Sequence, residues 1–110
     1  MNTDQIGLVS VARSDRGHTW QLAQALGCQI VSPWHLGDVE AVIIPTDRWE
    51  MGMAASVALG KGIPIIQLHA GEFTPHAFDD DVRHYISRVA ALRFCCHEFH
   101  RHRLLYPMHI

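Results

Sequence analysis

Short apolar runs alternate along the chain with longer stretches in which apolar residues recur at helical spacing. The short runs are rich in β-branched residues, and this pattern predicts β-strands. The predicted strands cover residues 5–12, 28–32, 39–45, 63–69 and 93–96. The run 39–45, VEAVIIP, is almost continuously apolar, which is typical of a strand buried on both faces.

Three longer stretches predict helices over residues 18–27, 47–62 and 77–92. The first ends at Gly27 and the second in a Gly-Lys-Gly sequence, as expected where a helix stops. In the third, Val82, Ile86 and Val89 form a buried stripe. The remaining stretch, residues 97–106, is either a last helix or a tail.

Strands that alternate with helices indicate an α/β fold with a parallel sheet of about five strands and right-handed crossovers. We therefore expect residues 1–110 to form a single Rossmann-like, three-layer domain. Ligands of such folds bind at the carboxyl ends of the strands. That rule selects the polar loops that follow the strands, which are residues 13–18, 46–50, 69–81 and 96–100.

Composition narrows the classes of function. The chain has 110 residues and a net charge of −2, which gives no electrostatic footprint for nucleic acid or an anionic membrane. No apolar run is long enough to span a bilayer, and the polar start MNTDQIG does not read as a signal peptide. The three cysteines, Cys28, Cys95 and Cys96, make no disulfide framework, so a cytoplasmic location is expected.

Nine histidines raise the question of a metal site. His97, His100 and His102 follow two cysteines, but their spacing matches no standard zinc pattern, so no metal is expected. No GxGxxG sequence is present, which argues against a dinucleotide site, and no cofactor is expected. The side chains expected to serve in packing are Trp20, Trp34, Trp49, Met51 and Met53. For Trp49, stacking on a base stays open as an alternative.

Several linked motifs resemble the hydrolysing UDP-N-acetylglucosamine 2-epimerase family. The motifs are a first turn with Arg13, Ser14, Asp15 and Gly17; a turn with Asp47, Arg48 and Glu50; a helix of small residues followed by Pro64; a loop with His69, Gly71 and Glu72; and an acidic helix with Asp79, Asp80, Arg83, His84 and Arg88. They occur in the family's order from residue 5 to about 103. The chain resembles a small version of the family's N-terminal domain.

The resemblance implies an enzyme, isomerase or hydrolase, that acts at C2 of a nucleotide-linked sugar. It implies acid or base roles for Asp47, Glu72 and Asp79, with Arg83 as the charge partner of a carboxylate or phosphate. The substrate-binding residues that it suggests are Arg13, Asp15, Arg48, Glu50, His69 and His84.

The chain also departs from the family pattern. Thr46 and Ala70 stand where the family has glycines, and Gln67 replaces the first histidine of an H-x-H sequence. The family's second domain, which provides much of the nucleotide site, has no counterpart in this sequence. A second copy of the chain, in a homodimer, or another partner is therefore expected to supply the other wall of the site.

Other interpretations stay open. Asp47 could simply cap the following helix, and Asp79–Asp81 could be a solvated first turn favoured by the helix dipole. A pattern around Glu50 is similar to nucleoside 2-deoxyribosyltransferases, in which this glutamate would be a nucleophile at the anomeric carbon. The domain could also bind a nucleotide or sugar phosphate without turnover, or be purely structural.

Overall fold

The computed structural model describes residues 5–10, 16–46, 48–71, 78–95 and 98, and of residues 16–18 and 78–80 only the backbone. The chain forms strands and helices in alternation. They are β1 (Ile6–Val9), α1 (Arg16–Leu26), β2 (Gln29–Val31), β3 (Ala41–Ile44), α2 (Trp49–Lys61), β4 (Ile65–Leu68), α3 (Phe78–Val89) and β5 (Leu92–Phe94). The predicted α/β class and the parallel sheet of about five strands are confirmed.

The five strands form one sheet in the order β2-β1-β3-β4-β5, and every neighbouring pair is parallel. The strand order reverses between β1 and β3, because the chain moves from β1 to β2 on one side and then continues through β3 on the other. In open α/β sheets such a reversal leaves a crevice at the carboxyl ends of the strands. The fold therefore directs a ligand towards the loops that follow β1 and β3.

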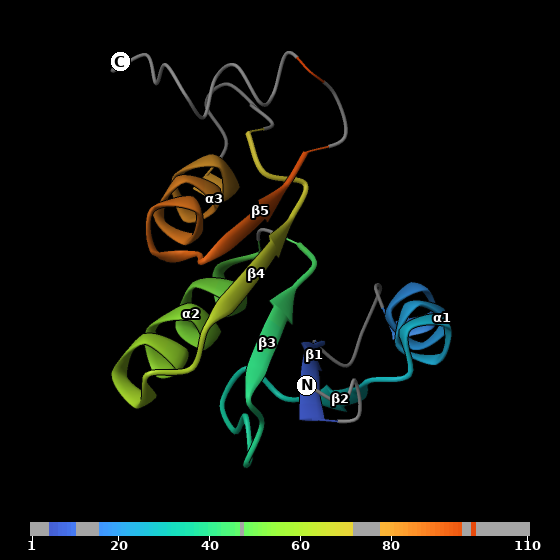
Figure 1. Ribbon diagram of the computed structural model, residues 1–110. Coiled ribbons are helices and arrows are strands. Elements are labelled where there is room, and N and C mark those ends of the chain that lie inside the picture. The colour runs from blue at the N-terminus through green and yellow to red at the C-terminus, as the bar shows by residue number, and fades with distance from the viewer. Residues whose placement is uncertain (1–4, 11–15, 47, 72–77, 96–97, 99–110) are drawn as a thin grey trace.

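Helices cover both faces of the sheet (Figure 1). Helix α1 lies on one face, while α2 and α3 lie side by side on the other, as right-handed crossovers on either side of a reversal require. On the face of α2 and α3, the core contains side chains from β1, β2, β3 and β4 together with both helices. On the face of α1, Leu8, Ala23 and Ile43 form a smaller core. These are the three layers expected from the sequence.

Small residues let α2 pack closely on the sheet and on α3. Ala54, Ala55 and Ala58 are completely buried. A Cβ atom at Gly52 would lie 3.3 Å from a methyl group of Val82, so the backbone of α2 approaches α3 closely there. The predicted stripe of α3 is confirmed at Val82 and Ile86, which are buried in the same core.

The predicted ends of the helices are partly confirmed. Gly62 closes α2 in the left-handed conformation at φ 71°, and Gly27 after α1 also has a positive φ of 72°. Helix α2 starts at Trp49 with Arg48 in the N-cap position, and Arg48 makes no side-chain cap, so the capping interpretation of Asp47 is not tested. Asp47 itself lies outside the described residues.

The boundary between α3 and β5 differs from the prediction. Helix α3 ends at Val89 rather than near residue 92, and β5 covers Leu92–Phe94 rather than 93–96. The Ala91 N–H donates to the Ile65 carbonyl at 2.8 Å, so pairing with β4 begins earlier than the local pattern indicates. Among the described residues, no helix combines the length and the apolar character needed to cross a membrane.

Gly7 is a position where the core leaves no room for a side chain. A Cβ atom there would lie 3.0 Å and 3.1 Å from the two methyl carbons of Val31 and 3.2 Å from a methyl carbon of Val39, both buried. Gly7→Ala is therefore expected to lower the free energy of unfolding by about 1–2 kcal/mol. The cost of overpacking the core is larger than the stability that a strand gains when alanine replaces the more flexible glycine. Urea unfolding followed by circular dichroism measures the change.

Gly60 provides the matched control. It is exposed in α2, and nothing lies within 4 Å of the Cβ position. Gly60→Ala is expected to leave the stability unchanged or raise it by up to about 1 kcal/mol. Equal effects of the two substitutions would contradict the assigned packing of β1.

Candidate functional site

Polar side chains are buried at the carboxyl end of β3. Glu50, in the first turn of α2, is only 9% exposed, and its Oε1 atom has no hydrogen-bond partner. The Oγ1 atom of Thr46 is also buried without a partner. Buried oxygen atoms without partners are uncommon in folded proteins, and water or a ligand usually satisfies them. These two atoms point to the end of β3 as a site that receives a polar group.

A cation accompanies the carboxylate of Glu50. The Nε atom of Arg48 lies 3.7 Å from Glu50 Oε1, which is an ion pair but too long for a hydrogen bond. Arg48 is partly exposed. Because a guanidinium group carries five N–H donors, Arg48 can bind an anion while it balances the charge of Glu50. The structure thus brings together two of the substrate-binding residues predicted from the sequence.

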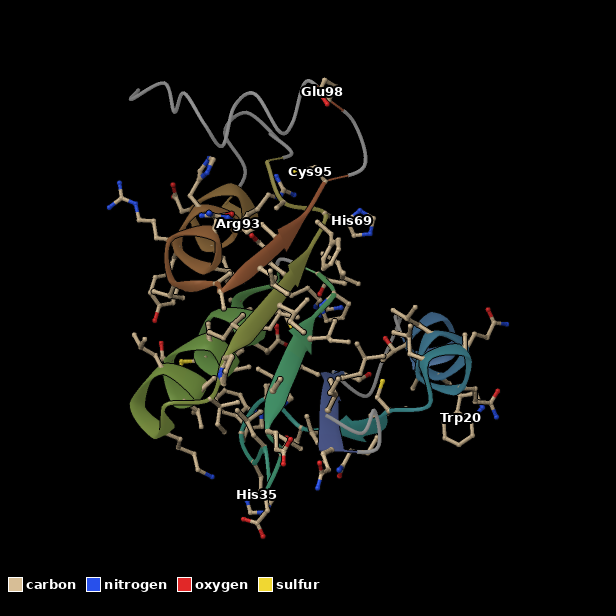
Figure 2. The ribbon with its side chains drawn as sticks, viewed as in Figure 1. Trp20, His35, His69, Arg93, Cys95 and Glu98 are labelled. Carbon is tan, nitrogen blue, oxygen red and sulfur yellow. The ribbon has the colours of Figure 1, made fainter. Side chains whose placement is uncertain are left out.

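The loop after β4 starts with an unusual backbone. His69 has a positive φ of 59°, a conformation that residues other than glycine rarely adopt, and Gly71 follows with a φ of 80°. Between them, buried Ala70 donates its N–H to the Phe94 carbonyl at 3.0 Å. Backbone strain of this kind concentrates at functional sites. His69 itself is exposed at the carboxyl end of β4 (Figure 2).

Arg83 is held in α3 by a network that starts in β4. The side chain of Gln67 is 1% exposed and donates from Nε2 to the Arg83 carbonyl at 3.1 Å. The hydroxyl of Ser87 donates to Gln67 Oε1 at 2.6 Å, and Arg93 Nη1 in β5 donates to the Ser87 carbonyl at 2.9 Å. Arg83 is itself 8% exposed. A buried guanidinium is strongly disfavoured unless it meets acceptors, and the role of Arg83 as a charge partner stays a prediction.

The remaining candidates are placed only in part. His84 is exposed on α3, next to Arg83 in the sequence. Asp79 is the second residue of α3, one turn before Arg83, but its side chain lies outside the described part of the chain. Outside it altogether are Arg13, Asp15, Asp47 and Glu72. Their catalytic and binding roles stay predictions.

Two features were missed by sequence reasoning. Gln67 was identified only as the residue that replaces the first histidine of the family's H-x-H sequence. In the structure, hydrogen bonds of its side-chain amide join β4 to α3. The packing interpretation holds for Met51, which is fully buried, and is wrong for the other four side chains, which are exposed by 42% to 55%. These are Trp20, Trp34, Trp49 and Met53. A polar residue in the middle of an apolar strand was the one signal that could have identified Gln67.

Thiol and metal chemistry receive no support from the described residues. Burial raises the pKa of the Cys28 thiol above its usual 9.0, so the thiol is a weak nucleophile at neutral pH. In the described ranges, no group of three His, Cys, Asp or Glu side chains is arranged to hold a metal ion. The three histidines considered for a metal site, His97, His100 and His102, lie beyond those ranges.

Comparison with known proteins matches residues 12–108 to the UDP-N-acetylglucosamine 2-epimerase family. The chain is 46% identical over 66 residues to the "GDP/UDP-N,N'-diacetylbacillosamine 2-epimerase (hydrolyzing)" of Campylobacter jejuni, which is 60% of this chain and 17% of that protein. It is 30% identical over 102 residues to the "UDP-N,N'-diacetylbacillosamine 2-epimerase (hydrolyzing)" of Legionella pneumophila, 90% of this chain and 26% of that protein.

A third relative is the "Polysialic acid biosynthesis protein P7" of Escherichia coli, which is 32% identical over 66 residues, 60% of this chain and 17% of that protein. The chain therefore spans 17% to 26% of the length of these relatives. The family match covers every described element after β1, including the ends of β3 and β4 with their buried polar groups. The chain belongs to the UDP-N-acetylglucosamine 2-epimerase family.

Proposed function

We propose that this chain contributes active-site residues to a hydrolysing 2-epimerase of a nucleotide-linked amino sugar. The observation that carries the proposal is the buried Glu50 carboxylate paired with Arg48 at the carboxyl end of β3, where Glu50 Oε1 and Thr46 Oγ1 have no hydrogen-bond partner. This is where the reversal of strand order directs a ligand. Family membership over residues 12–108 supports the same chemistry.

The proposed reaction has two steps. A carboxylate takes the proton from C2 of the sugar while the C1–O bond to the nucleotide breaks, and that electron pair leaves with the phosphate. A C1=C2 double bond forms in the sugar. Water then adds its oxygen to C1, and a proton returns to C2 on the opposite face, so the products are the epimerised free sugar and the nucleoside diphosphate.

The proposal assigns proton transfer at the two faces of C2 and at the leaving group to Asp47, Glu72 and Asp79. Arg83 stabilises the negative charge of the leaving phosphate or orients a carboxylate. We propose that Arg48, Glu50 and the other predicted binding residues hold the substrate. These others are Arg13, Asp15, His69 and His84.

The direct test is incubation of the protein with UDP-N-acetylglucosamine. UDP release in a coupled assay, together with an inverted C2 signal in the proton NMR spectrum of the sugar, is the expected result. If UDP raises the melting temperature but no UDP-sugar is turned over, the chain binds nucleotides without catalysis. Absence of both effects would reject the nucleotide-sugar proposal.

The buried carboxylate of Glu50 also favours a second candidate, an N-glycosidic enzyme. A buried glutamate with one oxygen that accepts no hydrogen bond could attack the anomeric carbon of a nucleoside monophosphate and release the free base. Chromatography of the free base after incubation with nucleoside monophosphates tests this activity.

The substitution Glu50→Gln separates the two candidates. It keeps the size of the side chain but removes its charge and its nucleophilicity. If Glu50 only binds substrate, we expect UDP release to fall by less than about tenfold, since the loss is that of one polar contact. Loss of all turnover, together with base release by the unchanged protein, would favour the N-glycosidic enzyme.

We further propose that a second copy of the chain or a partner protein completes the site. Supporting this are Leu92 and Phe94 of β5, the outer strand of the sheet, which are each 55% exposed. Their register with Ile66 and Leu68 of β4 puts the four apolar side chains on one face. Sedimentation velocity at micromolar concentration is expected to show a dimer, and a monomer would contradict homodimerisation.

A further inference from the structure

A chain of hydrogen bonds joins β4, α3 and β5. Gln67, the third residue of β4, donates from Nε2 to the Arg83 carbonyl at 3.1 Å. Its Oε1 atom accepts from the Ser87 hydroxyl at 2.6 Å, and the Ser87 carbonyl accepts from Arg93 Nη1 at 2.9 Å. Arg93 lies between β5 and α3 (Figure 2). Gln67 and Ser87 are only 1% and 6% exposed, so water from the solvent cannot replace the bond between them.

The bond from Arg93 completes the end of α3. Because α3 ends at Val89, the Ser87 carbonyl belongs to the last turn, where carbonyl groups lack a donor within the helix. The N–H group four residues later, that of Ala91, donates instead to the Ile65 carbonyl. The Arg93 guanidinium therefore caps the helix, as basic side chains commonly do at this end.

The bond from Gln67 is not needed to complete the helix. The Arg83 carbonyl lies in the middle of α3, where the N–H group of Ser87, four residues later, is its partner in the α-helical pattern. Ile65, on the same face of β4 as Gln67, belongs to the apolar core under α2 and α3. A buried amide adds little net stability to such a core, even when it is hydrogen-bonded. A satisfied polar network instead specifies one arrangement of the elements that it joins.

The arrangement that this network specifies is centred on Arg83. Gln67 bonds to the backbone of Arg83 itself, and the Arg83 side chain is 8% exposed. Since successive residues of an α-helix point about 100° apart, a rotation of α3 would carry Arg83 away from the buried interface. Gln67 also stands two residues before His69, which follows the carboxyl end of β4. One amide thus fixes α3 relative to a strand end of the kind at which α/β folds bind ligands.

We propose that Gln67 is a positioning residue, whose amide fixes the rotation of α3 on β4 and thereby holds Arg83 in place for the reaction. Gln67 acts through the backbone of Arg83 and not on the substrate. The inference rests on the proposed function, in which Arg83 stabilises the leaving phosphate or orients a carboxylate. A displacement of such a group by about 1 Å can lower a rate by about 100-fold.

Steady-state kinetics separate positioning from stability. Gln67→Leu is expected to lower kcat for UDP release from UDP-N-acetylglucosamine by about 10- to 100-fold and to leave KM within about 2-fold. The control is Gly7→Ala in β1, which is expected to lose a comparable amount of stability without altering the contacts of α3. Its kcat should equal that of the unchanged protein. Circular dichroism checks that every variant is folded at the assay temperature.

The double variant Gln67→Leu/Ser87→Ala is the sharper test. It leaves neither partner of the 2.6 Å bond unsatisfied, so it should be no less stable than Gln67→Leu. Because it still lacks the bond to the Arg83 carbonyl, its kcat should stay about 10- to 100-fold low. A kcat that returns to that of the unchanged protein in the double variant would show that Gln67 serves stability alone. Equal kcat in Gln67→Leu and Gly7→Ala would show the same, and either result overturns the inference.

A second measurement does not depend on turnover. The Nε–H signal of Arg83 in the nitrogen-15 NMR spectrum is identified by its loss in Arg83→Lys. Its hydrogen exchange is expected to be about 10-fold faster in Gln67→Leu and in the double variant, and unchanged in Gly7→Ala. If the unchanged protein turns over no UDP-sugar, faster exchange still supports the positioning of Arg83, and only the proposed function fails. Equal exchange in all variants overturns the inference even if UDP-N-acetylglucosamine is turned over.

Discussion

Turnover of UDP-N-acetylglucosamine is expected to fall by about 100- to 10,000-fold when Glu72 is replaced by glutamine or Asp79 by asparagine. Each substitution keeps the shape of the side chain but removes a group that can take or give a proton. Glu72 follows Gly71, where the backbone after β4 turns, and Asp79 is in the first turn of α3. The measurement is the rate of UDP release at saturating substrate, with circular dichroism as a check on folding.

Asp81→Asn is the matched control for these variants. Asp81 belongs to the same acidic run, is exposed, and carries no predicted catalytic role. Its substitution removes one favourable charge near the start of α3, which is worth less than about 1 kcal/mol of stability. Activity close to that of the unchanged protein is expected. If Glu72→Gln and Asp79→Asn are as active as Asp81→Asn, neither carboxylate takes part in the chemistry.

The second large effect is expected at Gln67. Gln67→Leu should lower the free energy of unfolding by about 1–3 kcal/mol, because it leaves the buried Ser87 hydroxyl without its acceptor and removes a donor from the Arg83 carbonyl. The hydroxyl of Ser87 can turn to the carbonyl four residues earlier, which limits the loss. Urea unfolding monitored by circular dichroism gives the value.

A double-mutant cycle with Ser87→Ala isolates the contact between Gln67 and Ser87. Replacing both partners by apolar side chains leaves fewer unsatisfied groups than replacing one, so the double variant should be less destabilised than the sum of the two single variants. Simple additivity would show that the hydrogen bond of 2.6 Å has no measurable coupling energy. The cycle also tests whether β4 positions α3, and with it Arg83.

The elements of the fold followed from local patterns. The uninterrupted apolar character of β3 matched a strand with all four residues buried, and the spacing of Val82 and Ile86 matched the buried face of α3. Gly62 ended α2 in a left-handed conformation, as its lack of a side chain predicts. These features are local, since they depend on residues that are neighbours in a single strand or helix.

Less of the candidate site could be predicted. Arg48, Glu50 and Arg83 were expected at the site, but the burial of Glu50 and Arg83 is a property of the assembled layers. The role of Gln67 depends on Ser87, which is 20 residues away in the sequence. The contact of Trp34 with Trp49 joins the connection between β2 and β3 to the first residue of α2, and their approach depends on the strand order. The spacing of apolar residues within one strand or helix does not indicate which residues of other elements it will contact.

The sequence by itself determined the alternation of strands and helices, the buried faces of these elements, and the family to which the chain belongs. It did so because the spacing of apolar residues and the order of the family motifs can both be observed directly in the linear sequence. Only the tertiary structure decided that two tryptophans touch each other and face the solvent, that Glu50 and Thr46 have buried oxygen atoms without a hydrogen bond, and that Gln67 joins a strand to a helix. These properties depend on distances between segments that come together only when the sheet is assembled.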